Sequence, residues 1–207
     1  TGLTNSSAFV AELNGATPRQ LEVEGNVTGA QWSPDGSKIA ASAAPSSLVD
    51  DFYTSQKIHI VDANSLKVTA RVDHKAKLGG MQWSPDSKRI AFIAGQDEND
   101  PIEGRVFVVD ATGGSPKILQ RDFKGMFHDI HWKDNKTLSY LASEGVYSSL
   151  GTLGLDGKLQ KTFNDNNLNI TSISLLKNNS VALVGNTAQH PGELCLLKPG
   201  ASTAQRL

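Results

Sequence analysis

The sequence has a single cysteine, Cys195, among its 207 residues, so it can form no internal disulfide. One thiol suits the cytoplasm and equally a bacterial periplasm. No apolar run approaches the roughly 20 residues that a transmembrane helix needs, so no membrane span is expected. Acidic and basic residues nearly balance, with a formal net charge of -1. Without a basic excess, neither nucleic acid nor an anionic membrane surface is an expected partner.

Aromatic residues make up only 6% of the chain, so its three tryptophans are useful markers. The stretch QWSPDGSKIAAS returns as QWSPDSKRIAFI, which places Trp83 51 residues after Trp32, and Trp132 follows 49 residues later. A degenerate fourth copy has Leu175 in the tryptophan position. Each copy contains a short strand that ends at this position, a polar turn, an apolar strand, and two further strands.

Four antiparallel strands at a period of about 40 to 50 residues are typical of a β-propeller blade. We therefore expect an all-β fold with four-stranded antiparallel blades, and half a blade at the start. The expected divisions are a half blade at 1–25 and full blades at 26–76, 77–122, 123–166 and 167–207. Because two spare strands make closure awkward, we expect a segment of a larger ring of about seven or eight blades.

The tryptophans Trp32, Trp83 and Trp132 are expected to have a structural role. A single blade cannot cover both of its own faces, so neighbouring blades must stack on it. A buried indole covers about 150–250 Å² and is a natural filler between blades. The open blade edges of such a segment would need a cover, either the remainder of a parent chain or a second copy.

The turn after the tryptophan has a local explanation. In Ser33-Pro34-Asp35-Gly36, proline presets its own φ, aspartate bonds nearby backbone, and glycine supplies a positive φ. The second copy keeps this pattern except for Ser87 at the glycine position. The turn therefore predicts a hairpin in both copies.

The WSPDG hairpin, followed by the pattern I-V-VD---G----L, resembles the repeats of two propeller groups. One is the N-terminal propeller of prolyl oligopeptidase-type serine peptidases, which include acylaminoacyl peptidases and dipeptidyl aminopeptidases. The other is the TolB-like periplasmic propellers. LVDDFYTSQKIHIVDANS at 48–65 and NTAQHPGELCLL at 186–197 resemble segments of the peptidase group, and the closing GASTAQRL is where such a chain would run on towards its hydrolase domain.

The resemblance implies a serine nucleophile on a G-x-S-x-G turn. The 207 residues contain no such turn; GVYSSLG at 145–151 has the wrong spacing. No catalytic residue is therefore assigned, and no cofactor is expected. The resemblance implies a non-catalytic propeller that gates peptide substrates and docks an α/β-hydrolase domain. A TolB-like protein-binding propeller is the alternative, and a sugar-acting propeller enzyme is a weaker third possibility.

The histidines and the acidic clusters are the residues of this sequence that could bind a metal ion or a partner. His128 and His131 lie on an expected strand, where an odd separation points to opposite faces, so no metal site is expected. Acidic residues gather in two loops between the second and third strands of neighbouring blades. They are candidates for docking a hydrolase domain or a peptide amino terminus, although most such clusters are simply solvated. The candidates are Asp50, Asp51, Asp97, Glu98, Asp100, Glu103 and the nearby Arg105.

Overall fold

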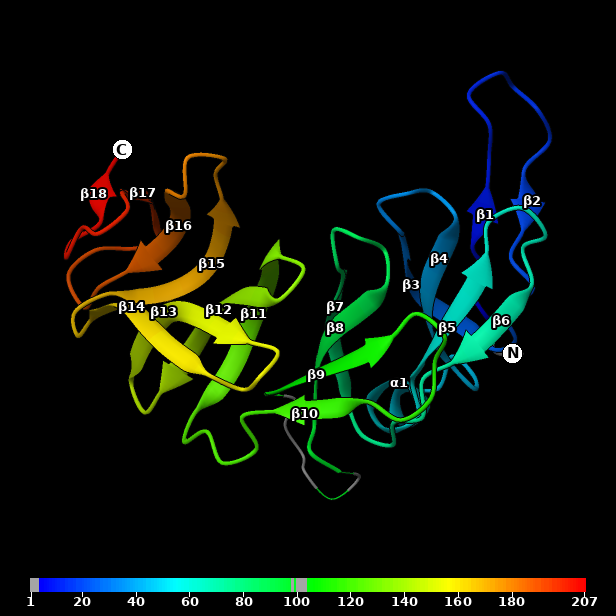
Figure 1. Ribbon diagram of the computed structural model, residues 1–207, viewed down its shortest axis with the longest axis horizontal. Helices are drawn as coiled ribbons and strands as arrows, with labels where there is room; N and C mark the ends of the chain where they lie inside the picture. Colours follow the sequence, from blue (N-terminus) through cyan, green and yellow to red (C-terminus); the bar gives the residue numbers. More distant parts are fainter. Residues whose placement is uncertain (1–3, 98, 100–103) are drawn as a thin grey trace. The chain divides into compact units, whose positions relative to one another are not determined.

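The computed structural model describes residues 4–97, 99 and 104–207. Two compact units, Thr1–Ile118 and Leu119–Leu207, divide the chain and are treated separately below. Each unit contains two four-stranded antiparallel sheets whose strands follow one another in chain order (Figure 1). The expectation of an all-β fold built from four-stranded antiparallel sheets is therefore confirmed.

The first unit opens with a hairpin of two short strands and continues with two full sheets. The hairpin contains β1 (Phe9–Val10) and β2 (Arg19–Gln20). The first sheet contains β3 (Asn26–Trp32), β4 (Lys38–Ala44), β5 (Lys57–Asp62) and β6 (Val68–Arg71), with the helix α1 (Val49–Thr54) between β4 and β5. The second sheet contains β7 (Leu78–Trp83), β8 (Arg89–Ala94), β9 (Arg105–Asp110) and β10 (Lys117–Leu119).

The second unit repeats this arrangement without a leading hairpin. Its first sheet contains β11 (Met126–Asp134), β12 (Thr137–Glu144), β13 (Tyr147–Gly154) and β14 (Leu159–Asp165). Its second sheet contains β15 (Asn169–Leu175), β16 (Val181–Asn186), β17 (Glu193–Leu197) and β18 (Gln205–Arg206). In the part of the chain that the structure describes, no helical segment has the length and apolarity needed to cross a lipid bilayer.

Both faces of the sheet β3–β6 are covered, and the alternation along β4 shows how. Ile39, Ala41 and Ala43 pack with Leu21 of the opening hairpin segment. Ala40, between them in sequence, packs on the other side with residues of the sheet β7–β10. Successive strand residues point to opposite faces, so one continuous apolar strand can serve two interfaces. Stacked sheets of this kind are what a propeller fold requires.

The first strands of the two sheets, β3 and β7, are in contact. At this place Trp83 is buried, with 5% of its surface exposed, and its Nε1–H donates a hydrogen bond of 3.0 Å to the Gln31 carbonyl. Trp32, at the same position of the preceding repeat, is 50% exposed. Trp132 is partly buried within the second unit. The three tryptophans thus share a sequence position and differ in burial.

An irregularity that the sequence did not predict recurs near the start of every first strand. The register shifts across Thr28 in β3, across Gly79 and Gly80 in β7, across His128 in β11 and across Thr171 in β15. Such bulges bend a strand and increase its twist. The Gly79-Gly80 pair in β7 and Gly29 beside the bulge of β3 carry a signal for it in the sequence, because glycine inside a strand often marks a bulge.

The Ser-Pro-Asp turn forms between β3 and β4 as its chemistry predicts. Ser33 Oγ donates to Asp35 Oδ1 over 2.7 Å, and the Ser37 N–H donates to the same oxygen over 3.0 Å. Gly36 has φ +71°, and Ser87 adopts φ 60° at the equivalent place in the next turn. The second turn keeps the hydrogen bonds, with Ser84 Oγ donating to Asp86 over 2.6 Å, so the left-handed position tolerates a serine.

Replacing Asp35 with asparagine should reveal a stability contribution that depends on pH. Hydrogen bonds from Ser33 and then Ser37 lower the pKa of Asp35 from its ordinary 3.8. A carboxyl group whose folded-state pKa is depressed stabilises the fold fully above about pH 5, and this is lost as the pH falls through the folded-state pKa. We therefore expect Asp35→Asn to be less stable than the wild type at pH 7 and the difference to shrink below about pH 4.

Urea denaturation at pH 7, 4 and 3 measures this difference. Asp73→Asn is the matched control, because within the described residues no hydrogen bond reaches the Asp73 carboxylate. A difference between Asp35→Asn and the wild type that stayed constant down to pH 3 would rule out the explanation.

Candidate docking surface

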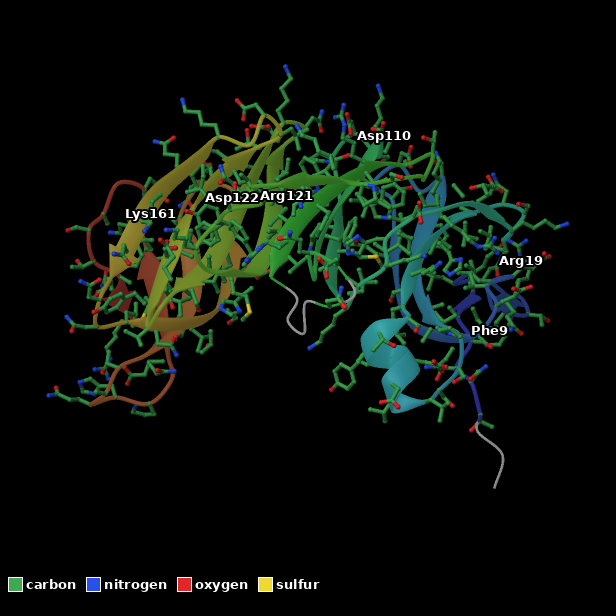
Figure 2. The ribbon with its side chains drawn as sticks, turned by 90° about the horizontal axis from the view of Figure 1, so that it is seen from below. Phe9, Arg19, Asp110, Arg121, Asp122 and Lys161 are labelled. Atoms are coloured by element: carbon green, nitrogen blue, oxygen red, sulfur yellow. The ribbon has the colours of Figure 1, made fainter. Side chains whose placement is uncertain are left out.

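The connection between β4 and β5 carries a short helix where a loop was expected. α1 spans only six residues, and none of its residues is buried. Asp50 and Asp51 lie in its first turn, where negative charge interacts favourably with the helix dipole. Thr54 Oγ1 donates to the Asp50 carbonyl over 2.8 Å and supports the last turn. Figure 2 shows the helix standing away from the strands of its own unit.

Four apolar side chains are exposed on and just before this helix, and we call them the α1 patch: Leu48, Val49, Phe52 and Tyr53. Val49 is 68% exposed and Tyr53 is 49% exposed, so the patch is open to solvent. Residues three and four apart are neighbours on a helix surface, which brings the members of the patch together. The Phe52 and Tyr53 rings lie 5.3 Å apart, edge to face.

A cation lies against the patch. The Lys77 ammonium is 5.0 Å from the centre of the Tyr53 ring, in cation–π geometry. Because Lys77 comes from the segment before β7, this contact joins the connection of one sheet to the next sheet of the same unit. The contact restrains Tyr53 while its ring remains half exposed.

Two of the acidic residues predicted as docking candidates, Asp51 and Asp97, are held locally. Asp51 accepts a hydrogen bond from Ser46 Oγ in its own connection. Asp97, after β8, accepts a bond of 2.8 Å from the Asn99 N–H. Arg105 is the first residue of β9 and lies opposite Ala94. Glu98, Asp100 and Glu103 lie outside the described residues. The role of these charged residues stays a prediction.

The histidines have separate partners. His128 Nε2 lies 2.6 Å from Ser143 Oγ, and His131 Nε2 lies 3.0 Å from the Asp129 carboxylate. Burial lowers the pKa of His128, so its neutral form is favoured. Across the described residues, no three histidine, cysteine, aspartate or glutamate side chains gather as they would around a metal ion.

Sequence reasoning selected Asp50 and Asp51 in this segment and missed the apolar side chains beside them. A signal was present in LVDDFY, where Leu48 and Val49 stand three to five positions before Phe52 and Tyr53. This spacing places apolar side chains along one side of a helix. In a segment of six residues the same letters also fit a buried strand, so periodicity alone could not decide.

No protein-family model matches the sequence, and a search of curated proteins finds no match. Solved structures do resemble the fold. The tricorn protease is similar with a TM-score of 0.64 and 13% identity, over 86% of this chain and 17% of that protein. A puromycin-hydrolyzing peptidase of Mycobacterium tuberculosis has a TM-score of 0.64 and 14% identity, over 92% of this chain and 33% of its own.

A puromycin hydrolase is also similar, with a TM-score of 0.62 and 16% identity, over 91% of this chain and 30% of that protein. The chain thus spans at most about a third of the length of these structures. At such low identities the likeness concerns the fold. The chain has the fold of a β-propeller segment.

Proposed function

We propose that this chain is the non-catalytic propeller portion of a prolyl oligopeptidase-type serine peptidase of the acylaminoacyl or dipeptidyl aminopeptidase kind. In this proposal each four-stranded sheet is one blade, and the β1–β2 hairpin is the outer half of another. The propeller docks an α/β-hydrolase domain and limits the access of peptides to it. A cofactor has no part in the proposal, because hydrolysis would rest on a serine outside these residues.

The α1 patch is the observation that carries the proposal. Contiguous exposed apolar side chains on a soluble domain mark interaction sites, and aromatic residues are enriched at protein interfaces. The patch lies in the connection between the second and third strands of its sheet. Corresponding connections of neighbouring blades emerge at the same rim of a propeller. The acidic residues Asp50 and Asp51 would surround the apolar contact with a polar edge, as interfaces commonly have.

The chain alone should show no serine-hydrolase activity. We expect no turnover of aminoacyl or acylated chromogenic peptides above the blank and no labelling by a fluorophosphonate probe. Labelling on a serine of these 207 residues would contradict the proposal. The reading frame beyond Leu207 separates the alternatives: a hydrolase domain with a G-x-S-x-G turn supports the peptidase, whereas a stop after one or two more blades favours a TolB-like binding propeller.

Docking through the α1 patch can be tested with the hydrolase part of the parent polypeptide, if the reading frame encodes one. Phe52→Ala together with Tyr53→Ala should weaken its association with this chain by about tenfold or more, as loss of interface hot spots does. Isothermal titration calorimetry measures the dissociation constant. Trp32→Ala is the matched control, since Trp32 is also an exposed aromatic residue of the same unit but lies beside the start of β4, at the opposite end of that strand from the patch. Equal affinities for the wild type and the double variant would exclude the patch as the docking site.

A further inference from the structure

A cavity of about 470 Å³ lies inside the second unit, between the sheets β11–β14 and β15–β18. Its volume is within the usual range of small-molecule sites. Leu175, Val181 and Leu197 line it from the last sheet, and Ser139, Leu150 and Thr152 line it from the sheet before. Of the residues that the sequence predicted to have a structural or docking role, Trp132 lines this cavity.

The strand register shows that Leu175, on the wall of this cavity, takes the position that Trp83 has in the first unit. Trp83 lies opposite Ile90, which lies opposite Val109. In the last sheet Leu175 lies opposite Val181, which lies opposite Leu197, so Leu175 takes the position of the tryptophan.

The facing sheets correspond in the same way. Ala40 pairs with Ile60, and both belong to the cluster around Trp83. Ser139 pairs with Thr152 at the equivalent positions of the second unit. Two apolar contacts of the indole are thus replaced by hydroxyl-bearing side chains on the wall of the cavity.

The second unit also has smaller side chains deeper in this interface. Phe92 and Phe107 pack beside Trp83, and the residues at their positions in the last sheet are Leu183 and Cys195. These two changes remove volume from the last sheet, whereas Phe163 of the facing sheet takes the position of Val72 and returns part of that volume to the deeper interface. The cavity is thus formed by these substitutions together with the turns that follow β15 and β17, which contribute Lys177 and Lys198 to its lining.

Three lysines line the cavity as well, namely Lys133, Lys177 and Lys198, and all three are exposed. Its described lining includes no carboxylate. Hydroxyl groups on the wall and several ammonium groups of one sign favour an anion over a neutral molecule. A purely packing defect would more simply be lined by apolar side chains alone.

We propose that this cavity is a binding site for a planar aromatic acid of about indole size. The ring occupies the space that Trp83 occupies in the other unit, between Leu150 and Val181. The carboxylate lies at the opening, near the three lysines. This assignment is independent of the proposed peptidase function, because it uses only residues of the second unit.

Titration of the full chain with indole-3-acetate tests the proposal, with the neutral indole-3-ethanol as the comparison ligand. We expect saturable binding with a dissociation constant on the order of 1 mM or below, as ligands of this size commonly show. Affinity should fall with added salt, because charge interactions at an exposed opening are screened. No saturable binding, or equal affinity for the two ligands, would overturn the proposed ligand class.

A variant with a tryptophan at position 175 tests whether the ligand binds in the cavity. Leu175→Trp should abolish binding of indole-3-acetate and raise the midpoint temperature of unfolding, because the indole fills the space itself. Leu194→Trp is the matched control, since Leu194 is exposed on β17 and does not line the cavity, and it should bind as the wild type does. Unchanged binding by Leu175→Trp would refute this location.

Thr152→Ile provides a second test that does not depend on inserting a large ring. It reproduces Ile60 of the first unit and narrows the cavity by little more than a methyl group. We expect it to fold normally and to weaken binding of indole-3-acetate several-fold. If this variant bound indole-3-acetate with wild-type affinity, the proposal that Thr152 lines the binding site would be contradicted.

Discussion

Replacing Trp83 with alanine is expected to lower the free energy of unfolding by about 3–5 kcal/mol, the usual cost of removing a buried aromatic side chain. Trp83 packs between two sheets with Ala40, Ile60 and Ile90. Its indole also donates to the Gln31 carbonyl over 3.0 Å. The substitution would leave a void between the sheets and remove a hydrogen-bond donor. Urea denaturation followed by circular dichroism measures the change.

Trp32→Ala is the internal control for this prediction. Trp32 lies at the same position of the repeat but is 50% exposed, so about half of its apolar surface is already in water. We expect a smaller loss of about 2 kcal/mol, because only about half of the indole surface is buried. Equal losses for Trp32→Ala and Trp83→Ala would show that the local hairpin, and not the neighbouring sheet, determines the contribution of the tryptophan.

Gly113→Ala is expected to lower the free energy of unfolding by about 3 kcal/mol, within the range of large single-mutation effects. Gly113 has φ +80°, which costs an L-residue about 1–2 kcal/mol. A Cβ atom at this place would lie 2.5 Å from the Arg71 carbonyl oxygen and 2.9 Å from Ala70 Cβ. The turn before β10 rests directly on β6 of the preceding sheet, and the Gly114 N–H donates a hydrogen bond of 2.9 Å to the Arg71 carbonyl.

Gly15→Ala separates the two causes. Gly15 occupies the same place in the FVAELNGATP copy of this hairpin and has φ +84°. A Cβ atom there would meet nothing within 4 Å. We expect only the conformational cost of about 1–2 kcal/mol. A loss for Gly15→Ala as large as for Gly113→Ala, in the same denaturation experiment, would mean that the contact with β6 contributes nothing.

Much of the fold could be predicted because its signals are local. Alternating and continuous apolar segments predicted the strands, and the Ser33–Gly36 turn predicted the hairpin that the structure contains. The helix α1 and the bulges at Thr28 and Thr171 could not be predicted in this way. Six helical residues are too few to show a period, and a bulge depends on the register of the partner strand.

The candidate sites were harder to predict than the fold. The acidic residues Asp50 and Asp51 were visible in the sequence, whereas the exposure of Phe52 and Tyr53 was not, because aromatic residues are usually assigned to a core. The cavity beside Leu175 was also hidden. A leucine in a tryptophan position looks like a conservative apolar change until the facing residues, such as Thr152, are known.

The sequence by itself determined the order of the strands, the turns between them and the repeat, since these follow from backbone preferences and apolar patterns within about a dozen residues. Only the tertiary structure decided which residues at matching positions of the repeat are buried and contribute strongly to stability. Trp32 and Trp83 lie in nearly identical sequence segments, and Gly15 and Gly113 lie in similar hairpins. Only Trp83 and Gly113 are packed against a neighbouring sheet. Burial and close contact depend on that neighbour, so the same local sequence can have a large or a small effect on stability.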